Sequence, residues 1–255
     1  IMNKLRINKA KATLNSGGIA SVIMGPNNSA DIIDFLGPIG FDAAWIECEH
    51  GPFTWADIQN VTRAADLWGM TSIVRVNKND ITLIGRTLDQ GATGICVPHV
   101  NTKSDAEKVV KGAKFGPIGE RGVYASRQSY GLDPLKYYEE VNDQIFLTVL
   151  IEEVRAVNNI KEILTVNDID VFFVAPGDLA QTMGYVGQQN HPEVKKVIES
   201  TIYQIRESGR NAGMLGDVNS IEYLEEIGVN FIGVNWGPWL LENAKTYISK
   251  VNSLR

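Results

Sequence analysis

The sequence alternates eight times between a short apolar run and a longer segment whose apolar residues have helical spacing. The apolar runs cover residues 19–24, 43–47, 72–76, 94–98, 145–151, 170–175, 212–215 and 231–235. The helical segments cover residues 29–37, 54–68, 80–90, 103–114, 153–165, 191–208, 219–227 and 238–253. This alternation is typical of parallel strands joined by helical crossovers. Eight such units in 255 residues predict an α/β protein with a closed (β/α)8 TIM barrel.

An open, doubly wound sheet is the alternative architecture, because its strands are also covered on both faces and equally apolar. No phosphate-binding GxGxxG or GxxxxGK[ST] motif stands at a strand–helix turn, which makes this alternative the weaker one. No change of composition marks a domain boundary. We therefore expect one domain over residues 1–255.

Residues 115–144 interrupt the regular alternation of predicted strands and helices. A connection of this length inside a compact domain is usually functional or disordered. The segment is rich in tyrosine and includes Arg121, Tyr124, Ser126 and Arg127. We expect it to form a lid or an interface.

Composition narrows the class of partner. The formal charge is −6 and the 24 basic residues are scattered, which argues against nucleic-acid binding. No apolar run approaches the ~20 residues that cross a bilayer, and no signal-peptide pattern precedes residue 20. Cys48 and Cys96 lack metal-site spacing and are too few for a disulfide scaffold. We expect a cytoplasmic protein that binds small molecules, with no membrane or nucleic-acid partner.

Ionisable residues gather at the carboxyl ends of the predicted strands, where barrel enzymes place their chemistry. Polarity resumes at the end of any strand, so the set is more informative than any single member. In chain order, the candidates are Glu47, Glu49, His50, Arg75, His99, Glu152, Glu153, Asp178 and Asn235.

Glu152 and Asp178 follow consecutive predicted strands, so their carboxylates should be neighbours at the barrel mouth. Two adjacent carboxylates repel unless a cation lies between them. Oxygen ligands completed by water and substrate suit Mg²⁺ or Mn²⁺. The alternative is a structural pair, with Asp178 capping a helix and Glu152 in a salt bridge.

Arg75 lies inside the apolar run "SIVRVN" and therefore needs an anionic partner. It could stabilise developing enolate charge, or it could close the rim through a salt bridge to Glu47 or Glu49. His50 follows Glu47 by three residues and adjoins Glu49, and an imidazole oriented by a carboxylate is a suitable proton shuttle. His99 can be read equally as a pocket residue or a structural one.

Five stretches resemble successive signatures of one family: "WIECEHGPFTW", "SIVRV", "GERGV", "LIEE" and "VFFVAPGDLAQTMGY". They are similar to the HpcH/HpaI-type metal-dependent aldolases, relatives of the citrate lyase beta subunit, over about residues 17–240. The resemblance implies a (β/α)8 barrel that cleaves 4-hydroxy-2-oxo acids into pyruvate and an aldehyde.

The resemblance also implies roles for individual residues. Glu152 and Asp178 would bind a divalent metal, Mg²⁺, Mn²⁺ or Co²⁺. Arg75 would stabilise the enolate, while His50, with Glu47 as its partner, would move the proton of the aldol hydroxyl.

Around the substrate, the resemblance implies that Pro176, Gly177 and Asp178 hold the pyruvate carboxylate. Arg121, within residues 116–140, would contact the aldehyde. Members of this family usually form hexamers, which assigns the tail 238–253 to packing on a neighbouring subunit.

Three positions depart from the family pattern. Glu47 stands where Asp is common, Leu150 where Gln is frequent, and His99 gives "VPH" instead of "VPM". These departures leave the substrate open and keep two alternatives. One is a barrel that binds the metabolite without turnover, and the other is a Schiff-base aldolase using Lys78.

Overall fold

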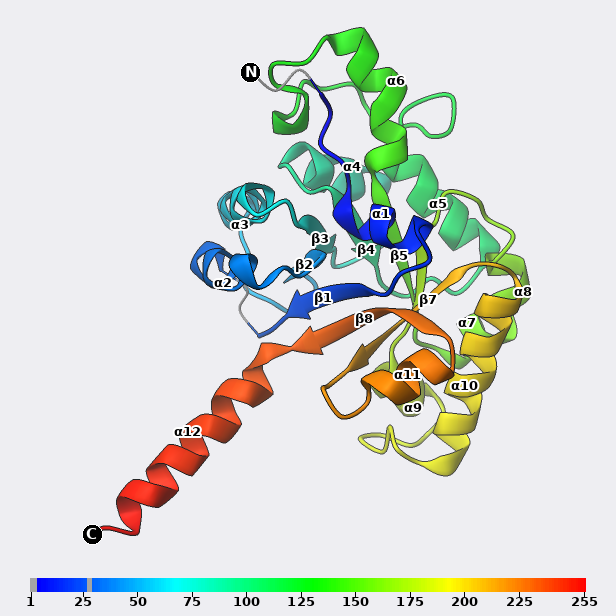
Figure 1. The fold of residues 1–255 in the computed structure, drawn as a ribbon. Coiled ribbons are helices and arrows are strands. Elements are labelled where there is room, and N and C mark those ends of the chain that lie inside the picture. Colours follow the sequence, from blue (N-terminus) through cyan, green and yellow to red (C-terminus); the bar gives the residue numbers. More distant parts are fainter. Residues whose placement is uncertain (1–3, 27–28) are drawn as a thin grey trace.

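The computed structural model describes residues 4–26 and 29–255, and its eight parallel strands close into a barrel (Figure 1). Each strand pairs with the next along the chain, and the last pairs with the first. The predicted (β/α)8 barrel is confirmed, and the open sheet is wrong. The strands are β1 (Ala20–Met24), β2 (Ala43–Glu47), β3 (Thr71–Arg75), β4 (Gly94–Val97), β5 (Phe146–Ile151), β6 (Val171–Val174), β7 (Asn211–Gly216) and β8 (Val229–Asn235).

Helices follow the strands as the sequence pattern predicts. They begin and end at ordinary helix signals: Thr54 and Asp57 form a reciprocal capping box, and Gly91 has a φ of 104° after a helix end. The segment 153–165 is divided into two short helices. The crossover helices are α2 (Ala30–Leu36), α3 (Trp55–Leu67), α4 (Ile81–Asp89), α5 (Lys103–Ala113), α7 (Val154–Asn158), α8 (Ile160–Ile163), α10 (Pro192–Glu207) and α11 (Ile221–Glu226), and α12 (Trp236–Asn252) follows the last strand.

Three further helices were not expected: α1 (Lys9–Asn15), α6 (Pro134–Gln144) and α9 (Pro176–Thr182). Helix α1 closes the amino-terminal end of the barrel, because its Ala10 and Leu14 belong to the hydrophobic cluster inside the strands. With only two buried residues, α1 has too little periodicity to be seen in the sequence.

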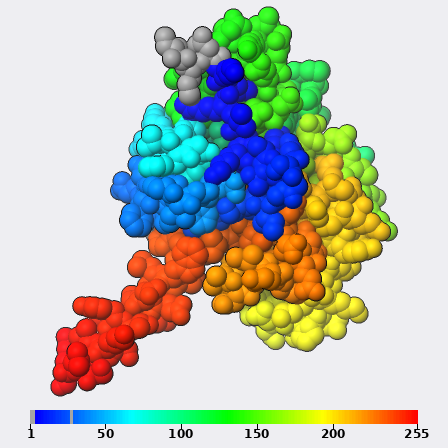
Figure 2. Space-filling model, viewed as in Figure 1, coloured from blue at the N-terminus to red at the C-terminus, as the bar shows by residue number. Residues whose placement is uncertain are grey.

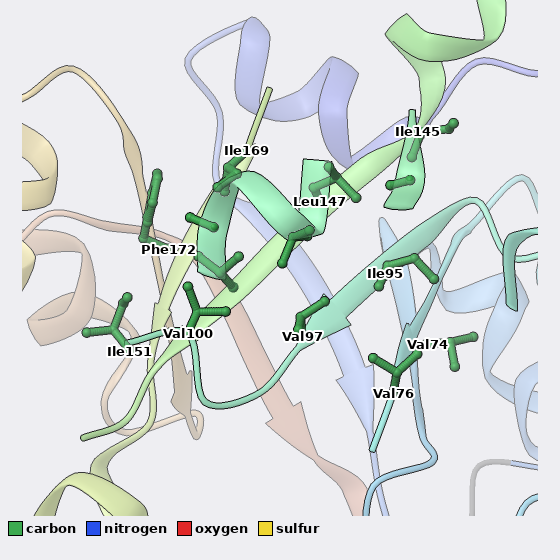
Figure 3. Packing of buried hydrophobic residues seen from close by; sticks show 14 of the residues in the cluster. Val74, Val76, Ile95, Val97, Val100, Ile145, Leu147, Ile151, Ile169 and Phe172 are labelled. Carbon is green, nitrogen blue, oxygen red and sulfur yellow. The ribbon is translucent and has the colours of Figure 1, made fainter. Parts of the chain in front are cut away.

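Two hydrophobic layers hold the barrel together. An outer layer between strands and helices includes Val74, Ile95 and Leu147 (Figure 3). The inner layer includes Trp45, Ile73 and Leu150. Because side chains alternate along a strand, the residue two positions after an inner residue also points inward. This two-residue alternation places three charged side chains on the inner face of the barrel mouth: Glu47, Arg75 and Glu152.

Residues 115–144 do not cover the mouth, so the lid prediction is wrong for this chain. They connect a helix to a strand, and such connections lie at the amino-terminal end of a barrel. Lys114 donates from Nζ to the carbonyl oxygens of Asn142 and Ile145, just before β5. Helix α6 lies beside the start of the chain in Figure 1. The interface prediction remains untested.

Helix α12 leaves the barrel after β8 and projects clear of it (Figure 2). It has no buried residue. Within residues 4–26 and 29–255, no helix is long and apolar enough to cross a membrane.

Candidate active site at the barrel mouth

Arg75 and Glu47 are register partners at the ends of β3 and β2. Arg75 Nε lies 2.6 Å from Glu47 Oε2, and Nη1 lies 3.1 Å from Glu49 Oε2. Burial lowers the pKa of Arg75, but the hydrogen bond and charge of Glu47 outweigh burial, so the net pKa is raised. The predicted rim salt bridge is therefore present. Arg75 also lines the mouth pocket, so the pair does not exclude a catalytic role.

Glu47 also holds the loop that follows β2. Its Oε1 accepts hydrogen bonds from the backbone N–H groups of Glu49 (2.9 Å) and His50 (3.1 Å). Gly51 makes the tight turn possible, because a Cβ there would lie 2.2 Å from the carbonyl oxygen of Glu47. The carboxylate of Glu47 thus fixes Arg75 and the loop.

The predicted pairing of Glu47 with the His50 imidazole differs from what the structure shows. Glu47 contacts the His50 backbone, and the imidazole Nε2 lies 4.0 Å from Glu49 Oε2 instead. The His50 side chain is 72% exposed at the edge of the pocket. Arg75 takes the carboxylate because a guanidinium forms a stronger, charge-assisted hydrogen bond.

His99 lies among three carboxylates. Its backbone has a φ of 55° and its N–H donates to Glu152 Oε1 at 2.6 Å. Its imidazole Nδ1 lies 2.9 Å from Glu153 Oε1, and its Nε2 lies 3.5 Å from Glu49 Oε1. Burial lowers the pKa of His99, but the bond to Glu153 and the surrounding negative charges outweigh it and raise the pKa.

Glu152 is the buried acid of the site, with a side chain only 2% exposed. Burial raises its pKa, and the nearby charges of Asp178 and Glu49 raise it further, although the N–H and ring of His99 act in the opposite direction. The effect of Asp178 on Glu152 shows that the two carboxylates are close enough to interact electrostatically.

The donor set fits a divalent cation held by few protein ligands. In the part of the chain that the structure describes, no group of three or more His, Cys, Asp or Glu side chains is arranged to hold a metal. Glu49 Oε2 is buried and its contact with Arg75 Nη1 at 3.1 Å is an ion pair, with no hydrogen bond to it among the described residues. Magnesium-like ions commonly take one or two carboxylates and complete their shell with water and substrate. Glu152 and Asp178 supply such a pair.

A pocket of about 680 Å³ opens beside these groups. Asp178 reaches it from the first turn of α9, and Gly177 leaves the backbone open, since a Cβ there would have no atom within 4 Å. The lining includes Glu47, His50, Arg75, Leu150, Pro176, Gly177, Asp178, Gln189, Asn190, Lys195, Met214, Asp217 and Tyr223. Gln189, Asn190, Lys195 and Tyr223 were missed, because they lie on later loops and helices and no strand end marks them.

Two residues considered from the sequence lie elsewhere. Arg121 is 3% exposed at the amino-terminal end, where Nη2 donates to Asp89 Oδ1 at 2.8 Å, so the expected aldehyde contact is not formed within one chain. The side chain of Lys78 is 68% exposed and lies 3.8 Å from Asp80, outside the pocket wall. This position gives no support to a Schiff base at Lys78.

Comparison with known proteins agrees with this geometry. The family model described as HpcH/HpaI aldolase/citrate lyase matches residues 21–234. The 2-keto-3-deoxy-L-rhamnonate aldolase of Escherichia coli O157:H7 is 32% identical over 246 residues, which are 95% of this chain and 92% of that protein.

Solved structures give the same result. The crystal structure of an HpcH/HpaI aldolase from Desulfitobacterium hafniense DCB-2 superposes with a TM-score of 0.89 at 27% identity, covering 96% of this chain and 97% of that one. A family protein from Burkholderia cenocepacia J2315 gives a TM-score of 0.89 at 26% identity, covering 96% and 99%. The chain therefore belongs to the HpcH/HpaI aldolase/citrate lyase family, and this homology makes it a carbon–carbon lyase.

Proposed function

We propose that this protein is a metal-dependent aldol lyase that cleaves a 4-hydroxy-2-oxo acid to pyruvate, or a close 2-oxo acid, and an aldehyde. The observation that carries the proposal is the pair of acids Glu152 and Asp178. The charge of Asp178 adds to the effect of burial in raising the pKa of Glu152, and Asp178 lines the pocket together with Arg75 and His50. The similarity to an aldolase whose name specifies a 2-keto acid supports the same class of substrate.

Glu152 and Asp178 would hold the cation, Mg²⁺, Mn²⁺ or Co²⁺. When bound, the cation supplies Lewis acidity that polarises the 2-oxo group of the substrate. The buried Glu49 carboxylate, whose Oε2 lies 3.1 Å from Arg75 Nη1, adds negative charge to the same region. Burial is the main cause of the raised pKa of Glu152 and the charge of Asp178 adds to it; a cation between the two acids would offset the contribution of Asp178.

Arg75 would stabilise the negative charge that develops when the C3–C4 bond breaks. Its guanidinium is held by Glu47 and Glu49 and lines the pocket, so its position is set before substrate binds. His50 would accept the proton of the C4 hydroxyl, and its exposed ring at the pocket edge gives it access to both substrate and solvent. We assign Glu47 to positioning Arg75 and the loop of His50.

The substrate carboxylate would lie against the backbone at Pro176, Gly177 and Asp178. The open space beside Gly177 supports this assignment, because a side chain at this position would occupy the part of the pocket next to the backbone. The rest of the substrate would extend toward Met214 and Lys195, where the wall mixes apolar and polar groups.

We further propose that the protein works as a homo-oligomer, a hexamer by the family resemblance, with α12 packed on a neighbouring subunit. This helix buries none of its residues within one chain. It exposes Trp239, Leu240, Leu241, Tyr247 and Ile248. A face of this kind marks an interaction surface. Both cysteines are free, and we expect the enzyme in the cytoplasm.

The direct test is exchange of the methyl protons of pyruvate in deuterated water, followed by NMR. Protein stripped by a chelator should be inactive, and Mg²⁺, Mn²⁺ or Co²⁺ should restore exchange. Glu152→Ala and Asp178→Ala should fail to respond to metal. A screen of aldehydes with pyruvate would then identify the partner substrate. Metal and pyruvate binding without exchange would favour the barrel that binds without turnover, while trapping of pyruvate by borohydride would favour a Schiff base.

A further inference from the structure

A second cavity, of about 280 Å³, lies at the amino-terminal end of the barrel, away from the mouth. Its wall includes Thr71 at the start of β3 and Ile145 just before β5. The first described residues of the chain and helix α6 close it from outside, through Leu5 and Tyr137 among others. It exceeds an engineered apolar cavity of about 150 Å³ that takes up benzene.

Arg121 is a buried guanidinium in the wall of this cavity. Its side chain is 3% exposed. The guanidinium group lies over the Phe115 ring, with its central carbon 4.6 Å from the centroid of that ring. Nη2 donates to Asp89, whereas Nε has no hydrogen-bond partner among the described residues. Arginine has five N–H donors, and leaving them unused in a buried place is costly.

Positive charge exceeds negative charge around the cavity. Arg6 and Arg127 share the carboxylate of Asp66, while Arg121 pairs with Asp89. Of these groups, Arg6, Arg121 and Asp66 line the cavity, so two guanidinium groups and one carboxylate face it. One small anion would balance the charge and accept from the unused Nε donor of Arg121.

The rest of the wall combines neutral polar side chains, such as Asn8 and Gln144, with an apolar part. The apolar part includes Met70, Leu88, Ala92, Val141 and Ile145. A ligand that satisfies both parts needs one carboxylate and a short hydrocarbon body. We propose that this cavity is a second binding site, separate from the mouth pocket, for a small aliphatic carboxylate whose anionic end meets Arg121.

Methionines report on the two pockets separately. Met70 lines the second cavity, while Met24 and Met214 line the mouth pocket. We would label the methionine methyl groups with ¹³C and titrate the full-length protein with butyrate, using neutral butanamide as a matched probe of nearly the same shape. Butyrate should produce a saturable shift of the Met70 methyl signal, and butanamide should not.

Two variants test the cavity itself. Arg121→Gln should weaken the Met70 response by about tenfold or more, because the charge-assisted contact is lost. The control Arg63→Gln removes the same charge from an exposed site on α3 and should leave the response unchanged. If Arg121→Gln does not fold, Ala92→Leu keeps the guanidinium, fills the cavity and should abolish the shift.

Three results would overturn the site. They are a Met70 signal that does not move with butyrate, an equal shift with butanamide, and shifts confined to Met24 and Met214. The last result would assign carboxylate binding to the mouth pocket alone.

Discussion

The two ends of this barrel contain the same kinds of charged residue but arrange them differently. At the amino-terminal end, most buried charges have partners: Lys11 Nζ lies 3.1 Å from Asp170 Oδ1, and Lys114 donates to two carbonyl oxygens. At the mouth, acids outnumber bases. Glu49, Glu152, Glu153 and Asp178 lie around His99 and Arg75, and Glu49 Oε2 has no hydrogen-bond partner among the described residues.

We infer from this difference that the charges at the amino-terminal end contribute to stability, whereas the charges at the mouth contribute to the reaction. Pairing a buried charge offsets its desolvation, so the amino-terminal pairs hold the strands and α1 together. An unbalanced cluster of acids costs free energy unless a cation binds it. The excess negative charge at the mouth supports the cation site that we propose there, at the end of the barrel where active sites lie. Breaking each arrangement should have a different consequence.

The largest effect is expected for Glu152→Gln and Asp178→Asn. Each should lower the metal-dependent rate of pyruvate proton exchange by at least about 10²-fold, because the charge that holds the cation is lost. The stability of the metal-free protein should not fall, since a repelling charge is removed. NMR exchange rates and urea unfolding measure the two quantities. Glu153→Gln is the control, and a loss as large as that of Glu152→Gln would contradict the assignment.

Arg75 variants should come next. Arg75→Gln should lower kcat by about 10²-fold, because stabilisation of developing charge is lost. Arg75→Lys should recover only part of the rate, since an ammonium group cannot reproduce the fork that contacts Glu47 and Glu49. Steady-state kinetics of aldol cleavage separate kcat from KM. A change in KM alone would indicate that Arg75 only binds the substrate.

The sequence predicted the barrel well because its signal is local. Strand and helix periods are visible in every unit, and the positions of Glu47, Arg75 and Glu152 at strand ends also placed them at the mouth. The sequence also predicted a salt bridge from Arg75 to Glu47 or Glu49 as one alternative. It did not show that this salt bridge would take the Glu47 carboxylate that was expected to orient His50. One sequence does not rank two possible partners of the same carboxylate.

The position of Arg121 shows a different kind of error. Residues 115–144 follow a helix and precede a strand, so chain topology alone puts them at the amino-terminal end. The resemblance to a family had placed Arg121 near the aldehyde instead. Lys195 and Tyr223 show the opposite case, because they enter the mouth pocket from helices that carry no strand-end signal.

A paired charge at the amino-terminal end should matter for stability and not for chemistry. Asp170→Ala removes the partner of Lys11 and the acceptor of the Leu147 N–H, a 2.7 Å hydrogen bond. We expect the free energy of unfolding to fall by about 2–4 kcal/mol, with kcat unchanged in the folded enzyme. Denaturant unfolding and kinetics below the transition provide the measurements. Asp143→Ala, at an exposed position on α6, should change stability by less than about 0.5 kcal/mol. Loss of kcat in folded Asp170→Ala would show that the two ends are coupled.

The smallest effect is a dependence of stability on pH at Lys114. Burial lowers its pKa from 10.5 to about 8. Between these values the unfolded chain keeps a proton that the folded protein releases, so the free energy of unfolding should rise with pH. From about pH 8 to about pH 9.5, the wild type should gain at most about 2 kcal/mol relative to Lys114→Met. Guanidinium unfolding at both pH values checks this, and a constant difference would mean that Lys114 titrates normally.

The most direct test of the contrast between the ends is Mn²⁺ binding to the chelator-stripped protein, followed by electron paramagnetic resonance. The wild type and Asp170→Asn should bind one Mn²⁺ per chain with equal affinity, because the amino-terminal end takes no part. Glu152→Gln and Asp178→Asn should lose that site. Unchanged Mn²⁺ binding in both mouth variants would contradict the assignment of the metal to these two acids.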